Sequence, residues 1–423
     1  MKNRTCLFLL SLALLGCTGN QGRRNDLRPL TENSYNEEYQ QHIVITDDSV
    51  RPFNLVENEA CIHVDLPQKM TETCLDTVFS SYTFIPLETR EECLIGHIAR
   101  IIKCPGCYCI LDRDNANVFL FEEDGRFRCK LGNKGHAGNE HLDAWNVAYD
   151  SKSGCVVMLD LAGRRLLSYS LEGTLLKVTP LYFLYTDMAF VGDGLVCLTG
   201  TAHNSATDIV DLSRLVYTDS MQRPMRADFP TSERRRQEFC YEEFMTQCGD
   251  KVYFNDMITD TLWEVSATSK SPFVVMTVDG KPRFSSEEQE NMTDKLHRQR
   301  RELLTFVYNY FVTKDYAVLH MSIPGNAGGV ANLICSRRTG RTKFMGEAVG
   351  MKRFGDYMSW NGLDGVSDDS TLIRVLNPAT TFLMYIQSKL PAARAMTNEE
   401  KRLLMDIKPD DNPVLMLEHL VKF

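Results

Sequence analysis

The chain has 423 residues, of which 47 are basic and 56 are acidic, so its net charge is −9 at pH 7. This acidic balance, with no clustered basic face, argues against a general nucleic-acid partner. The hydrophobic fraction of 43% is ordinary for a protein that folds around a packed core.

Residues 1–16 have the pattern of an export signal. Lys2 and Arg4 precede an apolar run from Leu7 to Leu15, which is too short to cross a bilayer as a permanent helix. The run ends in Leu-Leu-Gly-Cys at positions 14–17, which resembles the bacterial lipobox. We therefore expect cleavage before Cys17 and attachment of diacylglycerol to its thiol. The alternative is an ordinary secretory signal with a chance cysteine.

Residues 17–50 are predicted to form a disordered tether, and residues 51–423 one folded domain. Positions 18–41 are polar and cannot bury enough apolar surface to fold alone. Two or three acyl chains on Cys17 would hold the protein stably on a membrane, and the tether would hold the domain away from the lipid.

Cysteine is unusually frequent for an exported chain, with fourteen in the sequence. An oxidising compartment normally favours disulfide pairing. Several of these cysteines nevertheless lie within apolar runs typical of strands, where the thiol acts as a small apolar group. Examples are Cys109, Cys155 and Cys197. Mostly unpaired thiols in an exported protein suggest an anaerobic host.

A repeated pair of strands is the strongest internal pattern. Asp112 is followed by an aromatic residue after nine positions and by Gly125 after thirteen, and Asp160 and Gly173 repeat this spacing 48 residues later. Two β-rich runs joined by such a turn predict a hairpin, in which the Asp accepts turn amides and the glycine supplies a positive φ. Looser copies occur at 252–265 and 334–340.

Units of this length, each forming a small sheet, predict an all-β, six-bladed β-propeller; a β-sandwich with chance spacing is the alternative. The strand Val78 to Leu87 is expected to close the ring by pairing with the last blade. A helical insertion is predicted at about 285–311, because Ser285 and Ser286 can cap a helix with an acidic first turn. The blades are expected near 97–132, 140–180, 184–222, 238–280, 303–347 and 352–388.

Three stretches carry a family resemblance. They are Phe84–Thr89 (FIPLET) with Leu94–Ile101, then Phe121–Phe127 with the glycine-containing loop up to His141, and Asp410–Leu415 (DDNPVL). In order and spacing they resemble the six-bladed β-propeller lipoproteins of Bacteroides-like bacteria, which are distantly related to NHL-repeat propellers. The resemblance implies the fold and supplies no catalytic residues.

The glycine loop departs from the pattern of that family. Ala137, Gly138 and Asn139 stand where Gly, Pro and Gly are usual, and His141 replaces a Tyr, whereas Glu140 is retained. If the loop has a ligand common to the family, we expect this member to have lost or changed that ligand.

Four residues in loops are candidates for ligand binding: His136, Glu140, His141 and His203. Loops on a rigid β scaffold commonly carry binding residues. A metal at the histidines of the first loop is a weaker reading, and Glu140 is expected to accept backbone amides. No metal and no cofactor are predicted.

The cluster Cys104-Pro-Gly-Cys107-Tyr-Cys109 is interpreted as structural cysteines around a turn, with a local disulfide or a metal site as alternatives. For Trp145, Trp263 and Trp360, packing in the core is favoured over stacking on sugar rings.

The leading functional hypothesis is a non-catalytic binding or scaffolding module for a glycan, peptide or envelope protein. It would be an outer-membrane lipoprotein on the periplasmic side, since the residues after Cys17 lack an acidic export signal. A hydrolase or lyase with its site in the central funnel is the alternative, and a structural subunit of an outer-membrane complex is a third. The sequence carries no nucleophile elbow, Walker loop or His-Glu-x-x-His pattern.

Overall fold

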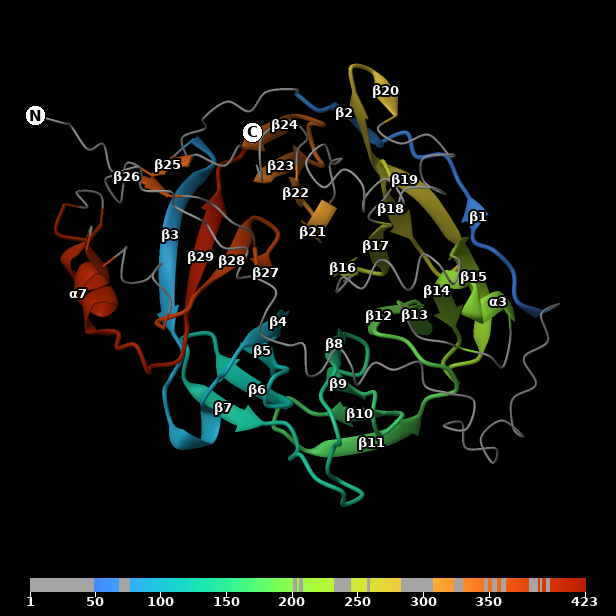
Figure 1. The fold of residues 1–423 in the computed structure, drawn as a ribbon, viewed down its shortest axis with the longest axis horizontal. Coiled ribbons are helices and arrows are strands. Elements are labelled where there is room, and N and C mark those ends of the chain that lie inside the picture. Colours follow the sequence, from blue (N-terminus) through green and yellow to red (C-terminus); the bar gives the residue numbers. More distant parts are fainter. Residues whose placement is uncertain are drawn as a thin grey trace, which may run out of the picture. The chain divides into compact units, whose positions relative to one another are not determined.

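Short apolar runs joined by tight turns form six antiparallel sheets, which stand side by side around a central axis (Figure 1). The central strands of the blades are buried on both faces, because each sheet packs between two others; Cys107–Asp112, for instance, is buried at every position. One hydrophobic cluster fills each space between neighbouring blades. The fold is therefore the six-bladed β-propeller that the repeats predict.

The computed structural model describes part of the chain, all of it within one structural unit, Ile45–Phe423. The described residues are 49–67, 77–200, 204, 208–231, 245–256, 259–282, 307–322, 330–345, 349–351, 356–358, 363–379, 387–388, 390–392 and 396–423. No helix among them is both long enough and apolar enough to pass through a bilayer. The export signal, Cys17 and the tether up to residue 48 lie outside the described residues.

The first three blades follow one another along the chain. Blade 1 consists of β4 (Ile98–Cys104), β5 (Cys107–Asp112), β6 (Asn117–Glu122) and β7 (Phe127–Lys130). Blade 2 consists of β8 (Asn146–Asp150), β9 (Cys155–Asp160), β10 (Arg165–Tyr169) and β11 (Leu175–Pro180). Blade 3 consists of β12 (Asp187–Val191), β13 (Gly194–Leu198), β14 (Ser213–Thr218) and β15 (Pro224–Pro230), with α3 (Asp208–Asp211) before β14.

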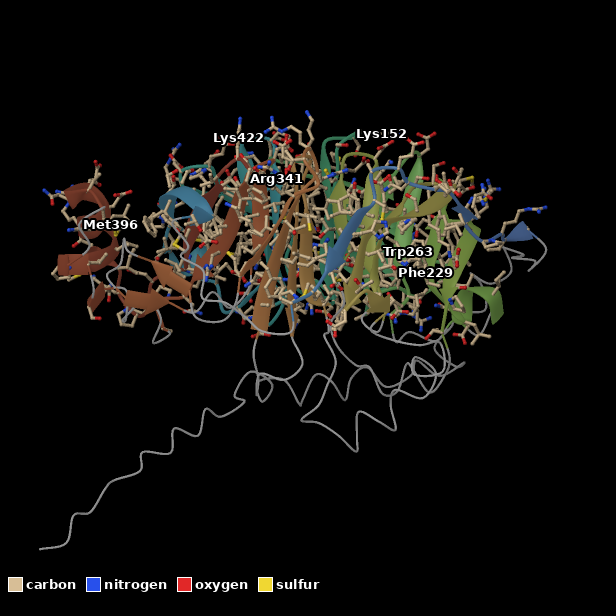
Figure 2. The ribbon with its side chains drawn as sticks, turned by 90° about the horizontal axis from the view of Figure 1, so that it is seen from above. Lys152, Phe229, Trp263, Arg341, Met396 and Lys422 are labelled. Atoms are coloured by element: carbon tan, nitrogen blue, oxygen red, sulfur yellow. The ribbon has the colours of Figure 1, made fainter. Side chains whose placement is uncertain are left out.

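Blades 4 and 5 keep the same order. Blade 4 consists of β16 (Thr246–Cys248), β17 (Lys251–Asn255), β18 (Thr261–Val265) and β19 (Ser269–Val278), and β20 (Lys281–Pro282) pairs with the end of β19. Blade 5 consists of β21 (Val307–Val312), β22 (Tyr316–Ser322), β23 (Val330–Ser336) and β24 (Thr342–Met345). In every blade the first strand is innermost and runs toward the turn that joins it to the second strand. We call the side that carries these turns the turn face; Lys152, in the β8–β9 turn, lies there (Figure 2).

Blade 6 closes the ring with strands from both ends of the described chain. It consists of β27 (Gly365–Asp368), β28 (Thr371–Leu376), β29 (Val414–Leu420) and β3 (Phe79–Pro86). The predicted closing strand is confirmed, and its partner is β29, with Val414 opposite Pro86 and His419 opposite Ser81.

Segments outside the blades cover some of their outer strands. β1 (Asn54–Leu55) and β2 (Ile62–Asp65) lie parallel to β19 at the outer edge of blade 4. The segment between β28 and β29 includes η6 (Leu390–Ala392) and α7 (Asn398–Asp406), which contribute Leu390 and Leu404 to the cluster between blades 5 and 6. η4 (Glu91–Cys93) precedes blade 1, and β25 (Val349–Met351) pairs with β26 (Asp356–Met358) as a separate hairpin.

The carboxylates at the ends of the second strands do more than cap a turn. Asp160 accepts the amide of Gly163 in the predicted turn (2.9 Å), and also the amides of Leu142 (3.2 Å) and Asp143 (3.1 Å) before the inner strand β8. Asp112 likewise accepts the amides of Gly96 and His97 before β4. One buried side chain thus fixes both the turn and the beginning of the strand that lines the axis.

Three predicted boundaries need correction. Blade 3 ends at Pro230 rather than 222. The third strand of blade 6 is not within 352–388, because residues 377–413 separate it from β28 and the apolar C-terminal strand β29 takes its place. The helix predicted at about 285–311 cannot extend past 306, since β21 begins at Val307; its other residues lie outside the described ranges.

Asn412, in the predicted DDNPVL motif, joins the ends of the ring. Its side-chain nitrogen donates to the carbonyl oxygens of Glu88 (2.8 Å) and Cys93 (2.9 Å), and its oxygen accepts the amide of Ile95 (2.9 Å). The Glu88 amide in turn donates to the carbonyl of Gly125 (2.8 Å). The C-terminal strand, the closing strand and blade 1 are therefore tied together at one point.

Two glycines test this junction. Gly125 and Gly154 both have positive φ (88° and 69°), but an added Cβ would lie 2.1 Å from the Pro86 carbonyl at Gly125 and meet nothing within 4 Å at Gly154. We expect Gly154→Ala to lower the unfolding free energy by about 1–2 kcal/mol through backbone strain alone. Gly125→Ala should cost about 1–3 kcal/mol more, because the closing strand must also shift. Denaturant unfolding measures both, and equal losses would show that the junction does not constrain the ring.

Candidate functional site

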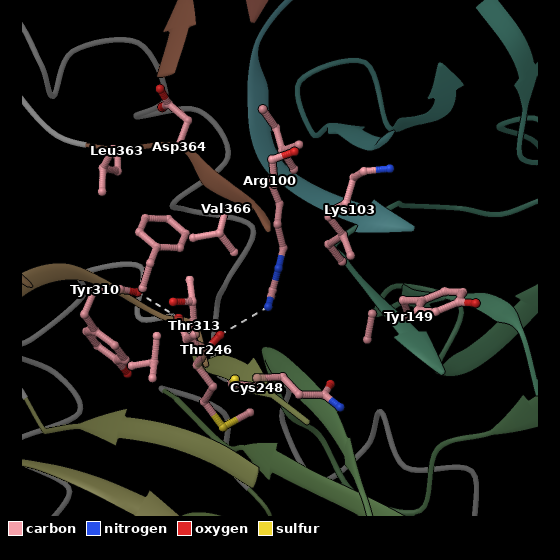
Figure 3. A pocket seen from close by; sticks show the side chains of 18 of the residues that line it. Arg100, Lys103, Tyr149, Thr246, Cys248, Tyr310, Thr313, Leu363, Asp364 and Val366 are labelled. Carbon is pink, nitrogen blue, oxygen red and sulfur yellow. Dashed lines mark hydrogen bonds between the residues drawn. The ribbon is translucent and has the colours of Figure 1, made fainter. Parts of the chain in front are cut away.

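The six innermost strands surround a cavity of about 470 Å³ on the propeller axis (Figure 3). These strands, β4, β8, β12, β16, β21 and β27, are each the edge of their sheet. An edge strand leaves one row of backbone N–H and C=O groups without a partner strand. The cavity wall therefore combines backbone polar groups with side chains from all six blades.

A belt of hydrogen bonds crosses the cavity near the beginning of the inner strands. Arg100 of blade 1 extends into the cavity (Figure 3), and its guanidinium reaches three other blades. It donates to the Asn146 side-chain oxygen (2.9 Å), to the Asp187 carboxylate (2.5 Å) and to the Met245 carbonyl (3.2 Å). Asp187 is fully buried, so this ion pair is largely shielded from water.

The belt continues from blade to blade. The Asn146 amide donates to the Thr186 carbonyl (3.1 Å), and the Met245 amide donates to Asp187 (2.6 Å). The Thr246 hydroxyl donates to the Tyr310 carbonyl (2.7 Å), and the Asn309 amide donates to the Leu363 carbonyl (3.1 Å). Five successive interfaces are bridged in this way, which holds the cavity in one shape without a ligand.

Polar side chains at the turn face of the cavity have fewer structural bonds. The hydroxyl of Ser151 and the side-chain oxygen of Gln247 have no hydrogen-bond partner within the described part of the chain, although Gln247 donates to the Phe190 carbonyl (2.7 Å). Asp368 and Asp369 are exposed and accept only nearby amides and a hydroxyl. This end keeps hydrogen-bonding capacity for a ligand.

The cations on the cavity wall have ion-pair partners, whereas the carboxylate of Asp364 has none among the described residues. Arg100 is paired with Asp187, and Lys103 is paired with Glu123 (2.5 Å). Asp364 lines the cavity, and its carboxyl is otherwise surrounded by protein. This burial raises the pKa of the carboxyl, although the Val375 amide, which donates to it, and the charge of Arg374 act in the opposite direction.

A second polar cluster is buried between blades 5 and 6. Arg374 pairs with Glu418 (3.0 Å), and His320 is hydrogen-bonded to Asn332 (2.7 Å). Burial raises the pKa of Glu418 to about 7 against the effect of Arg374, and burial lowers the pKa of His320. Since Glu418 is fully buried, this cluster is part of the packing between the blades rather than a surface for a ligand.

The three predicted loop residues within the described ranges, His136, Glu140 and His141, lie in different surroundings. His136 is exposed, whereas His141 is fully buried, and its Nε2 donates to the Ala116 carbonyl (2.7 Å). Burial lowers the pKa of His141. Glu140 accepts the Ala137 amide (2.9 Å), as predicted. His141 is not accessible to a ligand, and His203 lies outside the described residues.

The cysteine cluster surrounds a turn between two strands, as predicted. Cys104 and Cys107 are opposite each other across the Pro-Gly turn, and both are buried free thiols, as is Cys109. The interaction between the two neighbouring thiols lowers the pKa of Cys107 to about 7 and raises that of Cys104. Within the described ranges, no three His, Cys, Asp or Glu side chains are grouped as metal ligands.

The tryptophans within the described ranges pack against protein side chains. The Trp145 ring lies 5.0 Å from the Arg113 guanidinium, and Trp263 contacts Phe229 edge-on at 5.8 Å. Neither lines the cavity, which agrees with the preference for packing, and Trp360 lies outside the described residues.

Residues 60–418 match the family described as "Domain of unknown function (DUF4934)". The chain belongs to this family. No curated protein matches it. It is similar to the solved structure of a "Putative exported protein" from Bacteroides fragilis NCTC 9343, with a TM-score of 0.65 and 16% identity over 86% of this chain and 99% of that one. A DUF4221 member from Bacteroides vulgatus ATCC 8482 gives a TM-score of 0.47 and 8% identity over 84% and 99%.

The first of these structures confirms the fold that the sequence resemblance implied for this DUF4934 protein. The sequence pattern, in contrast, does not indicate which residues line the cavity. Arg100 lies in an apolar run, Ile98–Ile102, that reads only as a strand, and Asp364, Asp368 and Asp369 resemble ordinary turn residues. The one sequence feature that points to the cavity is the charge of Arg100 inside an apolar strand.

Replacing Arg100 tests the belt. Arg100→Met leaves Asp187 buried without its cation, which should lower the unfolding free energy by about 3–5 kcal/mol. Adding Asp187→Asn removes the uncompensated charge and should restore part of that loss. Arg126→Met, which breaks the exposed pair with Asp124 (2.8 Å), is the control and should leave the unfolding free energy nearly unchanged, because water screens that pair. Similar losses for both single variants, measured by denaturant unfolding, would contradict the belt.

Proposed function

We propose that this DUF4934 protein is a non-catalytic binding module of the bacterial cell envelope that holds a small ligand in its axial cavity. The observation that carries the proposal is the contrast between the two ends of the cavity. At the belt, the polar side chains are engaged in bonds between blades. At the turn face, they keep capacity for other partners.

A preformed cavity favours binding, because little conformational entropy is lost when the ligand enters. The volume of about 470 Å³ is within the usual range for sites that enclose one small molecule. The belt also fixes the side chains at the wall, since it ties the inner strands together over five interfaces. These features support a binding site that needs no rearrangement to accept its ligand.

The envelope location is supported by the sequence and by the comparison. The export signal and Cys17 predict a lipid-anchored protein, with the outer membrane facing the periplasm as the proposed site. The Bacteroides fragilis structure with the same fold is described as an exported protein. A partner from the envelope, whether a glycan, a peptide or a protein, is consistent with that location.

A hydrolase or lyase is the second candidate, and Asp364 is the residue that favours it. A carboxyl whose pKa is raised by burial is suited to general-acid catalysis. Enzyme activity would require substrate to reach Asp364 through the cavity. The test of the binding function therefore includes a search for altered ligand.

Filling the cavity tests the proposal. Val366 lines the cavity and is half-buried, so Val366→Trp should abolish binding by occupying the space. Leu176→Trp, which adds the same ring at a position 58% exposed on β11, is the control and should bind as the wild type does. Native mass spectrometry against neutral, anionic and amine-bearing oligosaccharides and short peptides measures the bound complexes, and Ala99→Phe repeats the test if Val366→Trp fails to fold.

Three results would oppose the binding role. The first is that no member of the panel binds the wild-type protein. The second is that Val366→Trp binds as well as the control, which would place the ligand elsewhere. The third is that a panel member is cleaved by the wild type but not by Asp364→Asn, or that purified protein contains stoichiometric metal, either of which would favour an enzyme.

A further inference from the structure

The charge on the cavity wall narrows the class of ligand that the proposed binding site would take. Two cations, Arg100 and Lys103, contribute to the lining, and each is already paired with a carboxylate that does not line the cavity. Three carboxylates contribute to the same wall, at Asp364, Asp368 and Asp369. None of the three has a cation within ion-pair distance among the described residues. The net charge that a ligand meets is therefore negative.

All three carboxylates come from one short segment of blade 6, and they lie at different heights. Asp364 precedes the inner strand β27, whereas Asp368 ends it and Asp369 begins the turn. The cavity is also lined by Ser151 of blade 2, whose hydroxyl can accept or donate, and by Gln247 of blade 4, whose side-chain oxygen has no hydrogen-bond partner among the described residues. Hydrogen-bond acceptors thus face the cavity on several sides, while the strong side-chain donors are used elsewhere.

A ligand rich in hydrogen-bond acceptors would need free donors on the cavity wall, and the side-chain donors there are already bonded to protein groups. The guanidinium of Arg100 is bonded to blades 2, 3 and 4, and the ammonium of Lys103 is bonded to Glu123 and to the Cys104 carbonyl (3.0 Å). The amides of Asn309 and Gln247 donate to backbone carbonyls. Without displacing these bonds, an anionic ligand could reach only backbone N–H groups of the inner strands, and it would meet three carboxylates.

From this excess of acceptors and of negative charge on the wall, we infer that the ligand is a small, non-anionic saccharide, neutral or amine-bearing. Its hydroxyl or amino groups would donate to Asp368, Asp369 and the Gln247 side-chain oxygen. Hydroxyl groups spaced around a sugar ring can reach acceptors on several walls at once. Hydrogen bonds to charged acceptors are among the stronger ones. The inference rests on the proposed function, since it assigns a ligand class to the same cavity.

The test uses three disaccharides of matched size that differ in charge. They are cellobiose, which is neutral, the chitosan disaccharide, which carries amines, and cellobiouronic acid, which carries a carboxylate. Isothermal titration calorimetry with the wild-type protein should show binding of the first two, and binding of the acid weaker by about tenfold or more. Binding of the acid as tight as that of cellobiose would overturn the inference.

Variants locate the effect. Asp368→Asn with Asp369→Asn keeps the side-chain shape and removes the charge, so it should weaken the chitosan disaccharide by about tenfold and reduce discrimination against the acid. Asp250→Asn changes an exposed residue in the corresponding turn of blade 4 that does not line the cavity, and it should leave all three affinities unchanged. Unchanged affinities in the double variant would contradict the assignment of these carboxylates.

The two proposals fail in different ways. If no saccharide of the set binds, while another molecule binds the wild type and not Val366→Trp, the ligand class is wrong and the axial binding site stands. If nothing binds in a manner that Val366→Trp abolishes, the binding function itself fails. If saccharide binding persists in Val366→Trp, the sugar is held outside the cavity and the inference is overturned.

Discussion

Closure of the ring by β3 is the constraint on which the rest of the structure depends. The core of this protein is divided into six hydrophobic clusters, each between two neighbouring blades. A row of such sheets leaves two apolar faces open at its ends unless the first and last blades meet. The pairing of β3 with β29 completes blade 6, and Ile85 and Leu417 then pack with blade 1 in the sixth cluster.

Closure also creates a central axis, at which polar groups of the inner strands lack partner strands. Six edge strands face one another, and their unpaired backbone groups, together with any charge among them, must be satisfied in a confined space. Near the beginning of the strands, the belt from Arg100 to Asn309 donates hydrogen bonds from blade to blade, to the buried carboxylate of Asp187 and to several backbone carbonyls. The turn face keeps open acceptors instead, and this difference along one axis is the physical basis for proposing a ligand there. Polar groups bonded between blades thus lie near the beginning of the inner strands, and most of the polar groups without such bonds lie at the turn face.

The sequence could predict the blades because their determinants are local. Asp160 and its turn, Gly125 with its positive φ, and the apolar runs of each hairpin all lie within about a dozen residues. The strand β29 was harder to place, because 37 residues between 377 and 413 separate it from the strand it continues. Its apolar pattern is visible, but its position as the third strand of blade 6 depends on closure.

The candidate site could not be found in the same way, because its residues come together only around the axis. Arg100 meets Asp187 across 87 positions of sequence, and nothing in either local pattern indicates the other. His141 shows the converse: a histidine in a polar, glycine-containing loop suggests exposure, whereas the fold buries it beneath its own loop against Ala116. Burial and convergence are properties of the closed ring, and local spacing does not encode them.

The most direct test of this account is a cross-link at the closure itself. Ser81 of β3 and His419 of β29 are directly opposite each other, so Ser81→Cys with His419→Cys places two thiols at a separation that suits a disulfide. Peptide mapping after mild oxidation should show that specific bond in nearly all molecules, with a raised midpoint of thermal unfolding relative to the reduced form. If the two cysteines stay unlinked in folded protein, or pair with others instead, then β3 does not close the ring.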